Sequence, residues 1–237
     1  MEKTWINYLG HDELFWSQYL VPNFMSNSIA LNAGDGNWTV ISPGASLLDP
    51  FSRIIEQDSL EGGDGLALVM PNAYHFMDVP VWLDKYPSAR LFASQQAIPA
   101  LNKKGIKKIL PLEETQPNLP KNYHLLFPAG HRGGDVWFVK SEGDAHLWIT
   151  CDSFLNYKRL SRQPLARAMQ KLLGAAPGLK ISQVIKYFIL TDKQAFKTWV
   201  LEHLEKFPPS DLIPAHGEPV SSEALANNLT DLITRRL

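Results

Sequence analysis

Three side chains of types that bind metal ions stand where predicted strands meet loops. His131 precedes a predicted hairpin, Asp152 follows its second strand, and His216 ends a short apolar run. Imidazole nitrogens and carboxylate oxygens are common zinc ligands, and an Asp at the end of a buried strand needs a cation or backbone donors. We therefore predict that the three residues converge on one metal ion. The alternative for Asp152 is a cap that accepts backbone N–H groups.

The hairpin between His131 and Asp152 is the element that must position both residues. Its predicted strands are Val136–Val139 and His146–Thr150, and Ser141 to Asp144 supply the polar turn between them. Cys151 lies next to Asp152 but has no His close to it in the sequence. We therefore interpret Cys151 as a small buried residue rather than a nucleophile.

The remaining predicted elements form a hairpin before residue 66 and then alternate between strands and helices. Residues 1–25 are predicted to be irregular, and residues 109–120, which contain three prolines, are predicted to be a loop. The predicted strands are Ser28–Leu31, Trp38–Ile41, Leu66–Met70 and Ala89–Ala93. The predicted helices are Leu47–Gln57, Val79–Tyr86, Gln95–Leu101, the amphipathic Pro164–Leu173, one that a capping box at residues 191–194 begins and Phe196 to Leu204 continue, and one that starts at Ser221. This mixture predicts an α/β sandwich, with sheets inside and helices outside, as a single domain over residues 1–237.

Composition excludes several classes of protein. The chain has 237 residues, 45% of them hydrophobic, which is enough to bury a sizeable core. With 23 Lys and Arg against 24 Asp and Glu, its overall charge attracts neither nucleic acid nor an anionic membrane. One Cys excludes an intrachain disulfide, and the N-terminal residues lack the apolar core of a signal peptide. We therefore expect a cytoplasmic protein without nucleic-acid or membrane partners.

The phrases around the three candidate ligands resemble the metallo-β-lactamase superfamily over roughly residues 27–220. The matching parts are Gly130-His131, Cys151-Asp152 and the phrase His-Gly-Glu-Pro that begins at His216. The resemblance implies a four-layer αββα sandwich with a metal site at one edge. It also implies that His131 belongs to a first metal position, that Asp152 is a bridging carboxylate, and that His216 is a ligand of a second position.

The segment that should carry the signature of that superfamily differs in this chain. The signature His-x-His-x-Asp-His should follow Leu66–Met70, where the chain reads Pro-Asn-Ala-Tyr-His-Phe-Met-Asp over residues 71–78. In the most literal register, Asn72 and Tyr74 replace two histidines and Phe76 replaces the Asp. The segment is similar to a degenerate branch with Pro-Asn-x-x-His. It predicts at most one metal ion, with His75 either a fourth ligand or a buried imidazole bonded to a carbonyl group.

Two functions of different classes remain open. The first is a mononuclear hydrolase in which Asp152 is catalytic and one zinc, iron or manganese ion is held by His131, Asp152 and His216, with His75 as the fourth ligand. The second is a metal-free, non-catalytic member of the fold that binds a small molecule or a protein. The lost histidines favour the second function, and the joint presence of the other three ligands favours the first. Neither the substrate nor the oligomeric state follows from the sequence.

Overall fold

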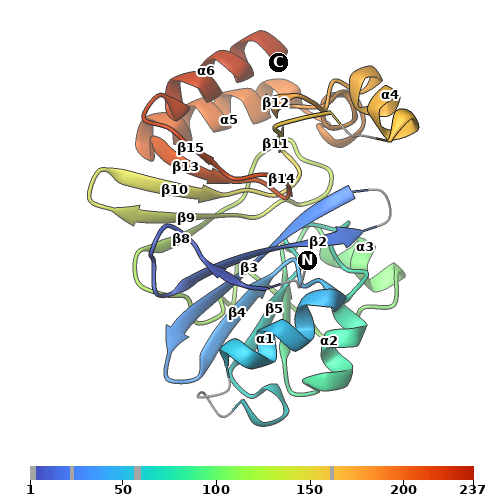
Figure 1. Ribbon diagram of the computed structural model, residues 1–237, viewed down its shortest axis with the longest axis vertical. Helices are drawn as coiled ribbons and strands as arrows, with labels where there is room; N and C mark the ends of the chain where they lie inside the picture. The colour runs from blue at the N-terminus through green and yellow to red at the C-terminus, as the bar shows by residue number, and fades with distance from the viewer. Residues whose placement is uncertain (1–3, 22–23, 56–59, 161–162) are drawn as a thin grey trace. The chain divides into compact units, whose positions relative to one another are not determined.

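The computed structural model describes residues 4–21, 24–55, 60–160 and 163–237. The chain forms two compact units (Figure 1). Unit 1 comprises residues 1–21 and 25–121, and unit 2 comprises residues 22–24 and 122–237. Each unit combines β-structure with helices and is described by itself. The single domain over residues 1–237 stays a prediction.

Unit 1 is built on a mixed sheet. A hairpin of β3 (Phe24–Gly34) and β4 (Asn37–Ile41) is followed by parallel pairing of β4 with β5 (Leu66–Val69), of β5 with β6 (Arg90–Ala93), and of β6 with β7 (Ile109–Pro111). All four residues of β5 are buried, as expected for a continuous apolar run in the interior of a parallel sheet. The predicted hairpin and the predicted interior strand at Leu66–Met70 are therefore confirmed.

Helices of unit 1 pack on this sheet through a cluster of aromatic side chains. The helices are α1 (Leu48–Ile54), α2 (Val79–Lys85) and α3 (Ile98–Lys103), and short 3₁₀ turns cover Ala45–Leu47 and Glu61–Gly63. The ring of Phe51 lies at the centre of the cluster, 5.1 Å from the ring of Trp82 and 5.6 Å from that of Trp38. All three side chains are fully or almost fully buried, so they join α1, α2 and β4 in one core.

Two predictions for unit 1 are wrong. The N-terminal segment is not irregular, because it contains β1 (Ile6–Asn7) and β2 (Leu14–Val21), and β2 extends the sheet beside β3. The buried residues of β2 are Leu14, Ser17 and Tyr19, which do not follow a strict period of two, so the sequence lacks the alternation that indicates a strand. The predicted loop at residues 109–120 begins with β7, whose Pro111 is tolerated because β7 lies at the end of the strand order.

Unit 2 contains a five-stranded sheet in the order β15-β13-β10-β9-β8. The predicted central hairpin is confirmed as β9 (Trp137–Glu142) and β10 (Ala145–Ile149), and β10 also pairs in parallel with β13 (Pro209–Ile213). The sheet is completed by β8 (Tyr123–Leu126) and β15 (Val220–Ser221). The predicted interior position of the second hairpin strand is thereby confirmed, since β10 has a neighbour on each side.

Two long helices cover a buried core in unit 2. They are α5 (Lys193–Lys206), capped by the carboxylate of Asp192, which accepts the N–H of Ala195 at 2.9 Å, and α6 (Leu225–Arg236). Their inward side chains pack with Trp137 of β9, Trp148 of β10 and Phe154, which precedes the next strand. Within the described residues, no helix is long and apolar enough to cross a membrane.

Three short strands of unit 2 lie outside its five-stranded sheet and pair with one another as a short ladder. The central strand β11 (Leu155–Tyr157) pairs with β12 (Gly178–Lys180) on one side and with β14 (His216–Gly217) on the other. Between β11 and β12 lies α4 (Pro164–Leu172), and a π-helical turn, η3, covers Ile185–Ile189. The ladder matters for the site because β11 follows Asp152 closely and β14 contains His216.

Candidate functional site

The loop that carries His131 is fixed by its own backbone. Gly130 has a φ of +71°, and a Cβ atom there would collide with the backbone oxygen of Asp192, so glycine is required. The carbonyl of Gly130 accepts the N–H of Thr191 at 2.9 Å, and the N–H of Arg132 bonds to the carbonyl of Ile189 at 2.9 Å. These bonds hold His131 in the interior of unit 2, where it is 1% exposed.

The imidazole of His131 contacts protein groups through both ring nitrogens. Its Nδ1 accepts the N–H of Gly133 at 3.2 Å, and its Nε2 lies 3.2 Å from Oδ2 of Asp135. The hydroxyl of Ser153 donates to the same oxygen of Asp135 at 2.8 Å. Since Nδ1 is an acceptor, the proton of a neutral ring is on Nε2, facing the carboxylate. His131, Asp135 and Ser153 therefore form a buried polar chain.

This chain does not have the order that nucleophilic catalysis requires. In a serine hydrolase, the imidazole stands between the hydroxyl and the carboxylate so that it can take the hydroxyl proton. Here the carboxylate of Asp135 stands between His131 and Ser153. Sequence reasoning did not identify Asp135, because it precedes a buried strand, whereas the signal that selected Asp152 was an acidic residue that follows one.

Asp152 and His216 face each other elsewhere in unit 2. The Nε2 of His216 lies 3.1 Å from Oδ1 of Asp152, and their side chains are 18% and 13% exposed. The parallel pairing of β11 with β14 sets His216 opposite Leu155. Gly217 has a φ of +90° and lies so close to Asn156 that a Cβ atom at position 217 would collide with the backbone carbonyl oxygen of Asn156. Two segments more than sixty residues apart therefore meet at this pair.

Carboxylates give this region a negative field. Burial raises the pKa of the Cys151 thiol well above its ordinary value, and the nearby Asp135 and Asp152 raise it further. Burial, with Asp152 and Glu218, raises the pKa of Tyr157 to about 12. Cys151 is a neutral thiol at physiological pH, which supports its interpretation as a buried residue rather than a nucleophile. A field of this sign favours a bound cation.

His75 belongs to unit 1, where its loop is held by neighbouring polar groups. Its Nδ1 lies 2.6 Å from the hydroxyl of Ser42, which in turn lies 2.9 Å from the hydroxyl of Tyr19. The carboxamide oxygen of Asn72 accepts the N–H of Tyr74 at 2.8 Å and that of His75 at 3.3 Å. Asn72, at a position where the literal register expects a histidine, thus stabilises the turn. A metal-binding role of His75 would have to use Nε2, because Nδ1 is bonded to Ser42.

Asp78, the next acidic residue of the same segment, also has a structural contact. Its Oδ2 accepts the N–H of Ala45 at 2.8 Å and so fixes the start of the turn before α1. The ammonium of Lys104 donates to the carbonyl of Ala73 at 2.7 Å and lies 4.2 Å from the ring centroid of Phe76. The segment at residues 71–78 is therefore held by hydrogen bonds within it and to its neighbours, and by cation–π contacts of Lys104 with Tyr74 and Phe76.

Comparison with solved structures identifies the fold. The DIM-1 metallo-β-lactamase is 12% identical, with a TM-score of 0.62 over 99% of this chain and 98% of that one. A metallo-β-lactamase from Hirschia baltica is also 12% identical, with a TM-score of 0.59 over 98% of both chains. A diflavin flavoprotein fragment from Nostoc sp. PCC 7120 is 11% identical, with a TM-score of 0.62 over 100% and 99%. The chain has the metallo-β-lactamase fold.

The metallo-β-lactamase fold confirms the predicted fold class, a mixed α/β structure with two sheets and helices. No protein-family model and no curated protein sequence matches the chain. At such low identity, the structural likeness establishes the fold alone. Within this metallo-β-lactamase-fold chain, the structure brings Asp152 to His216 and pairs His131 with Asp135, while His75 is held by Ser42 in the other unit.

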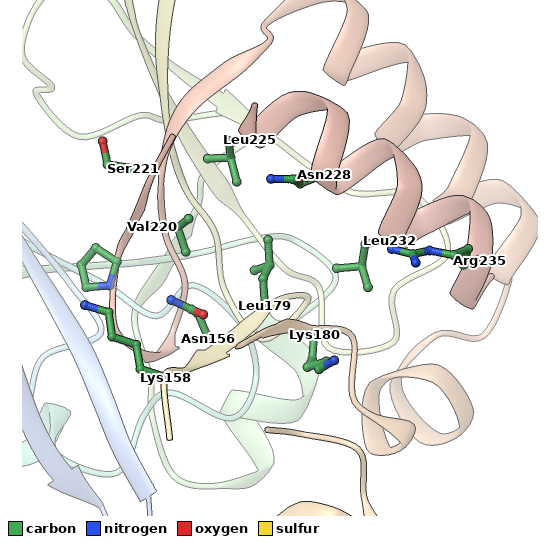
Figure 2. Close-up of a pocket in the computed structure, with 11 residues that line it drawn as sticks. Asn156, Lys158, Leu179, Lys180, Val220, Ser221, Leu225, Asn228, Leu232 and Arg235 are labelled. Atoms are coloured by element: carbon green, nitrogen blue, oxygen red, sulfur yellow. The ribbon is translucent and has the colours of Figure 1, made fainter. Parts of the chain in front are cut away.

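Unit 2 also contains a cavity of about 690 Å³ between the short ladder and α6. Figure 2 shows three basic side chains among its lining residues, Lys158, Lys180 and Arg235. Its apolar lining comes mainly from Leu179, Val220, Leu225 and Leu232. Such a lining suits a small molecule that combines an anionic group with an apolar part.

Proposed function

We propose that this protein is a mononuclear metal-dependent hydrolase in which Asp152 and His216 are the central ligands. The observation that carries the proposal is the 3.1 Å separation of Oδ1 of Asp152 and Nε2 of His216. Two donor atoms that each lie about 2.1 Å from a shared tetrahedral zinc ion are roughly 3.4 Å apart, so a small movement of the two side chains would let both bind one ion. The negative field around Cys151 and Tyr157 also favours a cation.

The donor set suits zinc, iron or manganese, because it combines an imidazole nitrogen with a carboxylate oxygen. A bound ion of this kind would act as a Lewis acid that polarises a carbonyl or phosphoryl oxygen. Asp152 would contribute the negative charge that offsets the cation. Tyr157 keeps its proton at neutral pH, since its pKa is about 12, and it can therefore donate a hydrogen bond but cannot act as a base. Esters, amides and thioesters are the substrate class that this chemistry suits.

The contributions of His131 and His75 to the ligand set stay predictions. His131 fits a metal less well than His216, because its two nitrogens contact Gly133 and Asp135. To bind an ion through Nδ1 it would have to lose the hydrogen bond from Gly133, and to bind one through Nε2 it would have to turn from Asp135. In the arrangement described, the role of His131 is to hold the buried chain with Asp135 and Ser153.

The alternative is a metal-free binding protein, and two observations favour it. The first is the engagement of His131 just described, and the second is the cavity lined by Lys158, Lys180 and Arg235. A small anionic molecule with an apolar part would be the ligand of that cavity. In this alternative, the Asp152–His216 pair is an internal salt bridge or hydrogen bond.

The test is the metal content of untagged protein after incubation with zinc or manganese and removal of free ions. Wild type should hold about one ion per chain, and Asp152→Asn and His216→Asn should hold markedly less. Asp84→Asn, which changes an exposed acid on α2, is the matched control and should bind like wild type. An absence of bound metal in wild type would reject the hydrolase proposal and favour the metal-free alternative.

A further inference from the structure

A long acid-free segment of unit 2 carries a strong positive charge. Residues 153–191 contain seven Lys and Arg and no Asp or Glu. The rest of the chain holds the other 16 of its 23 basic residues and all 24 acidic ones. The near-neutral total therefore conceals a basic segment on an acidic protein. Charge of this kind acts locally, because salt screens interactions beyond about 10 Å.

The same segment exposes large apolar side chains. The structure records thirteen exposed large hydrophobic side chains among the described residues, and six of them lie between residues 165 and 188. On α4 these are Leu165, Met169 and Leu172, which are 78%, 46% and 68% exposed. On and next to the η3 turn they are Val184, Tyr187 and Phe188. Such a concentration on one short segment is unusual for a surface that faces water alone.

Helix α4 is amphipathic but does not contribute its apolar stripe to the core. Leu165, Met169 and Leu172 recur at intervals of four and three residues, which places them on one face, while Arg167 and Lys171 lie on the opposite face. The helix begins with Pro164 at its first position and stops before Gly174, whose φ is +59°. Figure 1 shows α4 at the margin of unit 2. None of its described side chains is buried.

The η3 turn combines aromatic rings with ammonium groups. The ring of Tyr187, 60% exposed, lies 4.7 Å from Nζ of Lys193 and 5.5 Å from Nζ of Lys186. Phe188 beside it is 66% exposed. The N–H of Gln183, just before the turn, bonds to the carbonyl of Leu173 at 2.8 Å, which ties the turn to the end of α4. The two groups of exposed apolar side chains therefore lie on segments that are adjacent at this hydrogen bond.

From these observations we propose that α4 and the η3 turn form a docking surface for an anionic phospholipid bilayer. Leucine, methionine and aromatic side chains insert at the boundary between headgroups and acyl chains, and Lys and Arg bind the headgroup phosphates. A nucleic acid would use the positive charge but leaves the exposed Leu165 and Leu172 without a role. The surface lies apart from Asp152 and His216 in the sequence and does not depend on the hydrolase proposal. It replaces the expectation of no membrane partner, which rested on the total charge.

The direct test is flotation of the purified full chain with lipid vesicles. Wild type should float with vesicles of phosphatidylcholine mixed with phosphatidylserine, and much less with phosphatidylcholine alone or at high salt. Leu165→Ser with Met169→Ser and Leu172→Ser removes the apolar stripe, and Arg167→Gln with Lys171→Gln removes two charges. Each set should weaken binding on the order of tenfold or more, since each basic group near the surface and each inserted side chain contributes separately.

Matched controls distinguish binding through this surface from non-specific hydrophobic or electrostatic binding to vesicles. Leu9→Ser with Val81→Ser alters exposed apolar residues of unit 1, and Lys103→Gln with Lys121→Gln alters exposed basic ones. Both controls should bind like wild type, and all variants should melt like wild type because every altered side chain is exposed.

Three results would overturn the proposal. The first is failure of wild type to float with anionic vesicles. The second is binding that survives loss of the apolar stripe, or tighter binding to DNA or RNA than to vesicles at the same salt concentration. The third is a concentration-dependent dimer that the apolar variant abolishes while vesicle binding stays absent, because the occupant would then be a second copy of the chain.

Discussion

The buried contact between Ser153 and Asp135 allows a quantitative test of the polar chain that holds His131. Ser153→Ala removes one hydroxyl, which is fully buried and donates to Oδ2 of Asp135 at 2.8 Å. The acceptor is a carboxylate that is itself 2% exposed, so water does not readily replace the lost donor. A hydrogen bond to a charged group contributes roughly 1.5–3 kcal/mol to the free energy of unfolding.

The corresponding change in melting temperature is large enough to measure. For a chain of this size, 1 kcal/mol shifts the melting temperature by about 2–4 °C, so Ser153→Ala should melt roughly 3–12 °C below wild type. Differential scanning calorimetry measures the shift, and urea denaturation gives the free energy. Added chelator should leave the difference between the two proteins unchanged, because the hydroxyl of Ser153 bonds to Asp135 and the substitution alters neither Asp152 nor His216.

Two other serines calibrate the result. The hydroxyl of Ser182, also buried, accepts the neutral N–H of Ile185 at 3.2 Å, so Ser182→Ala should cost only about 1 kcal/mol. Ser88 is exposed, so Ser88→Ala should stay within about 0.5 kcal/mol of wild type. If Ser153→Ala destabilises no more than Ser182→Ala, the hydroxyl does not support a buried carboxylate and the proposed chain is refuted.

Three further predictions concern the surroundings of Asp152. With metal at about a thousand times its dissociation constant, chelator should lower the melting temperature of wild type by roughly 8–16 °C and leave that of Asp152→Asn unchanged. A wild-type melting temperature that chelator does not change would contradict the metal site. Tyr157 has a pKa of about 12 in the folded protein and an ordinary value of 10.0 in the unfolded chain, so the unfolded chain loses this proton first as the pH rises. The free energy of unfolding therefore keeps its full value below pH 10 and declines as the pH rises toward 12. Tyr157→Phe should therefore lose less stability over that interval, by on the order of 2 kcal/mol in urea titrations, and equal losses would show that Tyr157 is not the group responsible. Cys151, 1% exposed and with a raised pKa, should react with a thiol reagent only after denaturation, and labelling of native protein at the denatured rate would show that it is accessible.

The sequence by itself determined the elements whose signals are local. Turn residues between apolar runs predicted the hairpins β3–β4 and β9–β10, and a continuous apolar run predicted the interior strand β5. In each case the period of the side chains and the chemistry of the turn lie within about a dozen neighbouring residues. The loop-edge positions of Asp152 and His216 were likewise readable, because a polar residue that ends a buried strand stands out in the sequence.

Only the tertiary structure decided which partner each polar group has. Sequence reasoning did not identify Asp135, yet the path of the loop after Gly130 places Nε2 of His131 3.2 Å from its carboxylate. Ser42, more than thirty residues before His75, determines which nitrogen of that ring is engaged.

The apolar stripe of α4 shows the same division between sequence and structure. The amphipathic pattern of Pro164–Leu173 predicted that Leu165, Met169, Leu172 and Leu173 share one stripe, but the exposure of the first three depends on how distant parts of the chain pack. Periodicity is a property of one segment, whereas burial and hydrogen-bond pairing are properties of the segments that meet in space. These tertiary contacts depend on many small free-energy contributions from residues distributed over the whole chain, so no single segment of the sequence determines them.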